Sequence, residues 1–376
     1  MIRVLLVDDS LIALTVLQRM LKNEPGIKVV GTAANGIEAL SQINHLKPNV
    51  VCTDLHMPKM DGWELTRQIM ARHPLPILVV SVSVQEKTNE HNIFELLEAG
   101  AVDVFPKPRG GLTVADESVL AQEFVRKIKI ISGVVPISRH ASRYASLPEK
   151  KSPSPSLSKG QVKTPIRLVV IGASTGGPQA LLTILSSLPA RFPTPILCVQ
   201  HISFGFLEEM ISWMKSHCKM PVEIAQVGKR PQAGVIYFPP ERSHLVVDRE
   251  GQFAIPGPAD LGMIPNAQLG HCPSVDVVFH SAARRFGRST LGVLLTGMGK
   301  DGAEGLLSIY KAGGMTIAQD EASSVVFGMP KQAIELGAAR VVLPVTDIAP
   351  FLMKSVQINT GLSHTTSTKP GRGIQT

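Results

Sequence analysis

The sequence predicts an α/β protein built from two doubly wound, mostly parallel-sheet domains. The chain has 376 residues, which is more than one ordinary hydrophobic core needs. Short apolar runs alternate with helical periods on both sides of a stretch rich in Ser, Pro and Lys. The runs are continuous rather than alternating, which is typical of strands covered by helices on both faces.

The first domain is expected at residues 1–131. Leu11, Leu14, Leu17 and Leu21 recur at helical spacing and predict the buried face of the first helix. Five apolar, β-branched runs predict the strands, at 3–7, 28–33, 49–53, 77–82 and 102–105.

Residues 132–165 are predicted to form a flexible linker, because a Ser/Pro/Lys-rich segment cannot bury a core. A second domain is expected at 166–357, followed by a disordered tail at 358–376. Its predicted strands lie at 166–172, 195–200, 234–240, 289–297 and 314–319, and a hairpin is expected at 243–255.

The net charge of +8 does not indicate a nucleic-acid partner. Residues 1–131 carry −1 and residues 166–360 carry +2, whereas the linker alone carries +5. No apolar stretch is long enough for a bilayer-spanning helix and the N-terminus lacks signal-peptide features, so no membrane insertion and a cytoplasmic location are expected. The four cysteines are far apart, which predicts neither a zinc site nor a disulfide framework.

Three carboxylates are expected at one edge of the first sheet. Asp8 and Asp9 directly follow the first strand and Asp54 follows the third. Such neighbours repel one another unless a hard cation such as Mg²⁺ lies among them. Ser81 ends the fourth strand and Lys107 follows the fifth, so a hydroxyl and a cation reach the same edge. Any one of these Asp residues alone is as well explained as a cap.

A glycine-rich turn joins the first strand and first helix of the second domain. Gly172, Ser174 and Gly176 match G-x-S-x-G, in which a strained turn exposes a nucleophilic serine beside a helix N-terminus. A phosphate cradle for a dinucleotide and a simple turn with Ser174 as helix cap are the alternatives.

The next strand favours the nucleophile. It ends in Gln200-His201, where a dinucleotide fold would carry an acidic residue for the ribose. His201 is therefore the candidate general base. Asp301, in a Gly-rich loop after a later strand, is the candidate that orients it, although Asp301 could instead cap the helix expected near 303.

The first domain resembles bacterial response-regulator receiver domains over residues 2–125, through VLLVDDS, TDLHMPKMDGWEL, VVSVS and FPKP. The resemblance implies a flavodoxin-like fold with Asp54 as phosphoacceptor. It also implies Mg²⁺ held at Asp8, Asp9 and Asp54, with Ser81 as switch hydroxyl and Lys107 as phosphate contact.

The second domain resembles the catalytic domain of chemotaxis protein-glutamate methylesterases, the CheB family, through GASTGG, QHI, PSVDVVFHS, LLTGMGKDG and IAQDEASSVVFGMP. The resemblance implies a Rossmann-like domain in which Ser174, His201 and Asp301 form a triad. It implies further pocket roles for Thr175, Met298 through its backbone N–H, and His271. Cys272 stands where the family commonly has Arg. Structural roles are assigned to Asp276, Phe279 and Met315.

The two resemblances together imply an enzyme that hydrolyses glutamyl methyl esters on chemoreceptors, releases methanol and deamidates receptor glutamines. A histidine kinase is the implied phosphodonor, with Mg²⁺ needed for phosphorylation and no cofactor for hydrolysis. The unphosphorylated receiver is expected to lie over the mouth of the Ser174 site. An esterase acting on a partner outside chemotaxis, and a non-catalytic adaptor or nucleotide-binding module, are the alternatives.

Overall fold

The structure is a computed structural model that describes residues 1–82, 93–108, 114–134, 164–262, 264 and 271–357. The expected tail, and the expected linker from residue 135 to residue 163, lie outside the described residues. None of the described helices combines the length and hydrophobicity that crossing a bilayer requires.

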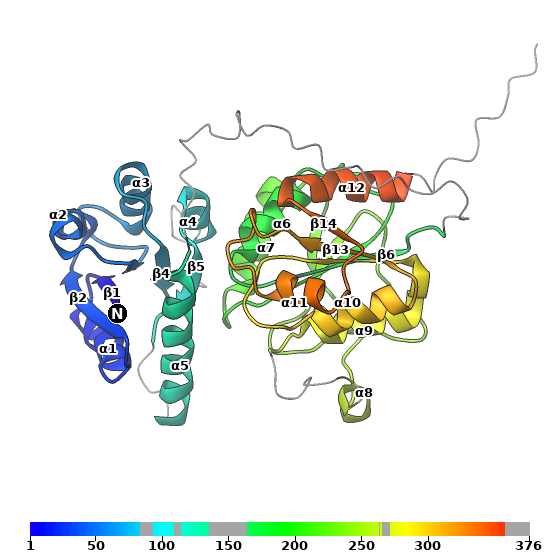
Figure 1. Ribbon diagram of the computed structural model, residues 1–376, viewed down its shortest axis with the longest axis horizontal. Coiled ribbons are helices and arrows are strands. Elements are labelled where there is room, and N and C mark those ends of the chain that lie inside the picture. The colour runs from blue at the N-terminus through cyan, green and yellow to red at the C-terminus, as the bar shows by residue number, and fades with distance from the viewer. Residues whose placement is uncertain (83–92, 109–113, 135–163, 263, 265–270, 358–376) are drawn as a thin grey trace, which may run out of the picture.

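The first domain is a five-stranded parallel sheet in the order β2-β1-β3-β4-β5, as the sequence predicts (Figure 1). Its strands are β1 (Ile2–Val7), β2 (Ile27–Ala33), β3 (Val50–Thr53), β4 (Ile77–Ser81) and β5 (Asp103–Pro106). Its helices are α1 (Leu11–Leu21), α2 (Gly36–Leu46), α3 (Gly62–Arg72), α4 (Ile93–Ala99) and α5 (Val114–Ile131).

Helices cover both faces of this sheet. Buried side chains of α1 and α5 pack on one face, and those of α2, α3 and α4 pack on the other. The predicted buried face of α1 is correct at Leu14, Leu17 and Leu21, but wrong at Leu11, which is 78% exposed. Leu11 is the first residue of α1, beyond the end of β1 at Val7, and it lies outside the core cluster that includes Leu14, Leu17 and Leu21.

The second domain has a seven-stranded parallel sheet in the order β14-β13-β12-β6-β7-β9-β8. Its strands are β6 (Leu168–Ala173), β7 (Ile196–Gln200), β8 (Val222–Ile224), β9 (Ile236–Phe238), β12 (Thr290–Leu294), β13 (Met315–Gln319) and β14 (Val341–Leu343). The predicted hairpin is confirmed as the antiparallel pair β10 (Val246–Val247) and β11 (Phe253–Ala254).

The helices of the second domain form two layers. α6 (Gly177–Leu185), α7 (Leu207–His217) and α12 (Val345–Gln357) pack on one face of the sheet, whereas α9 (Val275–Phe286), α10 (Ala303–Lys311) and α11 (Met329–Glu335) pack on the other. Two short elements, α8 (Pro258–Gly262) and the 3₁₀ turn Gly287–Ser289, complete the domain.

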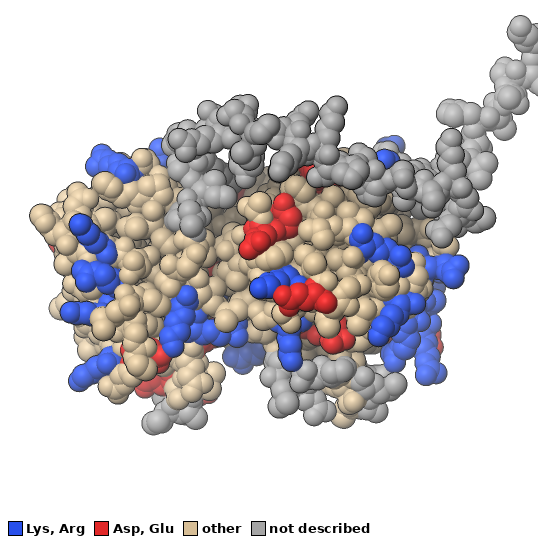
Figure 2. Space-filling model, viewed as in Figure 1, with Lys and Arg blue, Asp and Glu red and all other residues tan. Residues whose placement is uncertain are grey.

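The two domains are packed against each other, with α4 and α5 of the first domain facing the second (Figure 1). The Phe94 ring stacks on Trp213 at a centroid distance of 5.5 Å. The Gln179 side-chain amide donates to the Ala101 carbonyl over 2.8 Å, at the end of α4. On the face shown in Figure 2, basic and acidic side chains are interspersed over both domains.

Candidate active site

Ser174 lies in a tight turn between β6 and α6. Its N–H donates to the Thr296 carbonyl (3.0 Å) and its carbonyl accepts from Gly177 (2.7 Å). Gly176 has a φ of 74°, and a Cβ at Gly177 would lie 2.0 Å from Gln200 Oε1. The glycines therefore let the turn close tightly over the Gln200 side chain, with Ser174 at the carboxyl edge of the sheet.

His201 follows β7 and lies beside this turn. Its Nε2 is 2.7 Å from Asp301 Oδ2, and its Nδ1 is buried without a hydrogen-bond partner among the described residues. Because an ionised carboxylate can only accept, Nε2 carries the proton and Nδ1 is the atom free to act as a base. His271 stacks on the imidazole with centroids 4.1 Å apart.

Asp301 accepts several hydrogen bonds. Besides His201, it accepts from Ser274 Oγ (2.8 Å) and from the N–H groups of Val275 (2.8 Å) and Asp276 (2.9 Å), at the start of α9. Burial alone would raise the pKa of Asp301, but the hydrogen bond and charge of His201 and these N–H groups hold that pKa well below its usual range. The carboxylate is therefore charged and fixed in orientation.

Ser174 and His201 line one hollow of about 60 Å³, although no hydrogen bond joins the Ser174 hydroxyl to the imidazole in the described structure. Catalytic serine–histidine contacts are often long before substrate binds. Thr175 and His271 line the same hollow. The three residues of the predicted triad are thus brought together at one edge of the sheet.

Helix α5 of the first domain closes one side of this hollow. Glu123, Arg126 and Lys127 line it, and Arg126 Nη2 donates to His271 Nε2 over 3.4 Å. Burial, followed by the charges of His201 and Arg126, lowers the pKa of His271 to about 3, so His271 is neutral. The first domain thus lies beside the site, as expected, and the expectation that it restricts access to Ser174 stays a prediction.

The loop after β12 carries Met298, the expected oxyanion donor. A Cβ at Gly297 would lie 2.6 Å from Ser174 Cβ, so this loop touches the serine directly. The next residue, Met298, is 40% exposed, and its N–H donates to no group in the described part of the chain. Met298 does not line the hollow itself, and its role stays a prediction.

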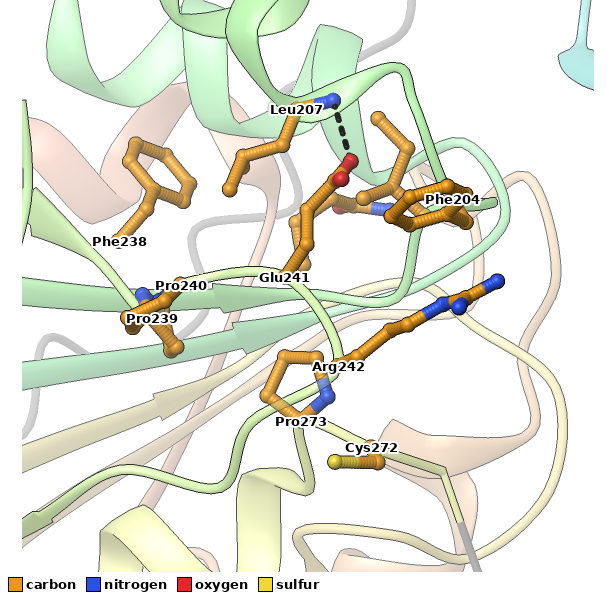
Figure 3. A pocket seen from close by; sticks show the side chains of 11 residues that line it. Phe204, Leu207, Phe238, Pro239, Pro240, Glu241, Arg242, Cys272 and Pro273 are labelled. Carbon is orange, nitrogen blue, oxygen red and sulfur yellow. Dashed lines mark hydrogen bonds between the residues drawn. The ribbon is translucent and has the colours of Figure 1, made fainter. Parts of the chain in front are cut away.

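A second hollow, of about 80 Å³, lies next to the first and shares Ile202, Cys272 and Pro273 with it (Figure 3). At its rim the Arg242 guanidinium lies 3.7 Å from the centroid of the exposed Phe204 ring. The neighbouring Glu241 instead turns toward the start of α7, as Figure 3 shows, where it accepts from the Leu207 N–H over 3.1 Å.

The three carboxylates of the first domain meet as predicted. Ligand oxygens of Asp8, Asp9 and Asp54 all lie within 4.8 Å of one another. Lys107 Nζ is 2.7 Å from Asp54 Oδ2 and 2.8 Å from Asp8 Oδ2. Burial raises the pKa of Asp8, and the charge of Asp54 adds to this effect. Three carboxylates and one ammonium leave net negative charge on an all-oxygen cluster, which fits a hard cation such as Mg²⁺.

Ser81 is the last residue of β4 and is buried beside this cluster's edge of the sheet. Its carbonyl accepts from the Lys107 N–H over 2.8 Å, which ties the two predicted switch residues together. Burial would lower the pKa of Lys107, but the hydrogen bonds and charges of Asp54 and Asp8 raise it. Lys107 is therefore a fixed cation at this edge.

Comparison with known proteins identifies both halves. Residues 4–115 match the response regulator receiver domain, and residues 169–352 match the CheB methylesterase domain. The protein-glutamate methylesterase/protein-glutamine glutaminase of Nitrosospira multiformis is 39% identical over 95% of this chain and 97% of its own length. This chain belongs to the CheB family.

Other members resemble it to a similar degree. Protein-glutamate methylesterase/protein-glutamine glutaminase 2 of Methanospirillum hungatei is 42% identical over 94% of this CheB-family chain and 97% of its own. The crystal structure of the Thermotoga maritima CheB methylesterase catalytic domain is 36% identical, covers 51% of this chain and 99% of its own, and has a TM-score of 0.46.

Several residues at the site were not predicted. Ser274 and Asp276 contact Asp301, and three residues of α5 line the hollow. The Pro-Ser-Val-Asp pattern before an apolar run is a helix N-cap signal, so it gives the start of α9. It does not say that the start of α9 faces Asp301.

Proposed function

We propose that this chain is a phosphorylation-activated protein-glutamate methylesterase of chemotaxis adaptation, which hydrolyses glutamyl methyl esters on chemoreceptors and deamidates receptor glutamines. The observation that carries the proposal is the His201–Asp301 pair at 2.7 Å in the same hollow as Ser174. A charged acid, an oriented imidazole and a serine at a glycine turn are the parts that acyl transfer needs.

In the proposed mechanism each residue has one step. Ser174 Oγ attacks the side-chain carbonyl and passes its proton to His201 Nδ1, and Asp301 stabilises the resulting imidazolium. The Met298 N–H and the start of α6 stabilise the oxyanion. His201 returns the proton to the departing methanol or ammonia, and water then releases the glutamate by the same route.

The receiver domain controls this chemistry. A histidine kinase is the expected phosphodonor and Asp54 the acceptor, with Lys107 positioned to contact the phosphoryl group. Mg²⁺, held by Asp8, Asp9 and Asp54, would neutralise charge between carboxylate and donor. Phosphorylation would draw Ser81 toward the phosphoryl group and weaken the docking of α4 and α5, which uncovers the hollow.

The alternatives are less well supported. In a nucleotide-binding module the glycine turn would cradle phosphate, whereas here Gln200 fills the space beneath it and donates to the Ser174 carbonyl over 2.9 Å. A non-catalytic adaptor would not need a buried, oriented His–Asp pair. The named relatives do not favour a partner outside chemotaxis.

Substitution of the nucleophile tests the proposal. We expect Ser174→Ala to remain folded and to lose methanol release from methylated receptor membranes by about 10³-fold or more, because binding and oxyanion effects alone remain. Circular dichroism checks the fold. Release at the wild-type rate by folded Ser174→Ala protein would rule out the serine hydrolase.

A further inference from the structure

Two helices beside the triad cap each other. Asp301, just before α10, accepts from the N–H groups of Val275 and Asp276 at the start of α9. In return, the Asp276 carboxyl accepts from the Gly305 N–H of α10 over 2.7 Å and from the Gly302 N–H. Each helix start is thus satisfied by a carboxyl group from the other segment.

This arrangement needs a very close approach of the two helices. A Cβ at Gly305 would lie 2.5 Å from Phe279 Cβ and 3.1 Å from Asp276 Cα. At this distance the two carboxyl groups are close enough for the charge of Asp301 to act on Asp276. Asp276 therefore touches the residue that orients the catalytic histidine, without lining the hollow itself.

Two neighbouring carboxyl groups cannot both be charged at low cost. Asp301 holds the charge, because His201, Ser274 and two N–H groups donate to it. Burial, and then the charge of Asp301, raises the pKa of Asp276 to about 7. Of the two carboxyl groups, Asp276 is therefore the one that takes up a proton as the pH falls below about 7.

We propose that Asp276 is a positioning residue of the hydrolase: its carboxyl group caps α10, its N–H donates to Asp301, and these contacts together hold Asp301 in line with His201. The inference rests on the proposed serine hydrolase and adds a fourth side chain to its machinery. Asp276 touches neither substrate nor reacting atoms. Its effect on the reaction passes through Asp301.

Two substitutions separate this role from simple stability. Asn has the shape of Asp, and its side-chain carbonyl oxygen can still accept from the Gly305 N–H, whereas Ala has no acceptor there. We expect Asp276→Ala to lower kcat by about 10-fold to 100-fold with KM unchanged, because the start of α10 and the adjoining Asp301 lose their anchor. Asp276→Asn should stay within about threefold of wild type, since it keeps the cap of α10.

The experiment uses the full-length protein and two readouts. One is methanol release in the presence of acetyl phosphate. The other is the labelling of Ser174 by a small fluorophosphonate, measured by intact mass. In that reaction the Ser174 Oγ–P bond forms, fluoride leaves and His201 takes the proton. Labelling needs no receptor, so it would still occur if chemoreceptors were not the substrate. If the triad were wrong, labelling of Ser174 would no longer depend on His201.

A double-mutant cycle shows whether Asp276 acts through Asp301. In a protein that already carries Asp301→Asn, adding Asp276→Ala should lower the rate of Ser174 labelling by less than about a further threefold. The matched control is Asp347→Ala, which removes another carboxylate from the first turn of a helix. In this variant Ser174 should be labelled at the wild-type rate. Multiplicative effects in the cycle, or unchanged labelling of folded Asp276→Ala, would overturn the proposal. If the Ala variant does not fold, an Asp276→Asn defect as large as that of Asp301→Asn would overturn it.

Discussion

The nucleophile depends on a residue that has no functional group. Gly177 lets the turn after β6 close over Gln200, so a methyl group there would collide with the Gln200 carbonyl oxygen, 2.0 Å from the ideal Cβ position. The turn or Gln200 must then move, and with it the Ser174 backbone, to which Gln200 donates. Residue 177 therefore fixes where the serine hydroxyl points.

We expect Gly177→Ala to slow fluorophosphonate labelling of Ser174 by about 10-fold to 100-fold, because small displacements of a nucleophile are costly. The matched control is Gly257→Ala, where an added Cβ meets nothing within 4 Å. Equal labelling rates for the two variants would show that the turn tolerates a side chain.

Asp276 also predicts a pH dependence of stability. Its pKa in the folded protein, about 7, lies above the ordinary value of 3.8. The free energy of unfolding of wild type therefore falls as pH rises from about 4 to 7, and Asp276 causes no further loss above pH 7. Asp276→Asn has no proton to lose. Relative to wild type, its free energy of unfolding should therefore improve by about 2–3 kcal/mol between pH 5 and pH 8. Urea denaturation at both pH values measures this, and a constant difference would contradict it.

At the scale of elements, the closed arrangement depends on α4. Glu98 Oε1 accepts from Trp213 Nε1 over 2.7 Å and lies 3.1 Å from His217 Nε2, so one carboxylate links α4 to α7. The Trp213 ring is buried against Phe94. Loss of Glu98 would leave a buried indole N–H without its acceptor, which destabilises only the docked state.

We therefore expect Glu98→Ala to raise methanol release by the unphosphorylated full-length protein by about fivefold to tenfold, which corresponds to 1–1.4 kcal/mol. Glu335→Ala removes an exposed carboxylate from an i,i+4 pair with Lys331 and is the control. A basal rate no higher than that of the control would mean that this contact does not restrain the enzyme.

The sequence allowed most elements to be predicted, for a physical reason. Continuous apolar runs report strands buried on both faces, and ten strands of the two parallel sheets were found this way. The three-residue strands β8 and β14 were missed, because their mixed burial gives no such run. Leu11 was misplaced because helical spacing cannot show where the sheet beneath a helix ends.

The triad residues could be predicted because each lies in the segment that follows a strand at the same sheet edge, so their position follows from order along the chain. Asp276 was assigned a purely structural role. Its contact with Asp301 depends on the close packing of α9 and α10, which periodicity does not reveal. The contribution of α5 to the hollow was missed at residue level, because docking between domains depends on surface complementarity.

For the whole molecule, the proposed control joins two sites through one domain. The cluster of Asp8, Asp9 and Asp54 lies at one edge of the receiver sheet, while α4 and α5 of the same domain face the hydrolase. Under the proposal, phosphorylation of Asp54 reaches Ser174 by altering how the domains dock. This requires that the two phosphorylation states differ in affinity for the hydrolase surface.

The most direct test measures methanol release from methylated chemoreceptor membranes by the full-length protein, with and without acetyl phosphate and Mg²⁺. Wild type should be stimulated by phosphodonor, Asp54→Asn should keep only the low basal rate, and Ser174→Ala should be inactive in both conditions. The account would be contradicted if Asp54→Asn were stimulated as strongly as wild type, or if phosphorylated wild type released methanol no faster than the unphosphorylated protein.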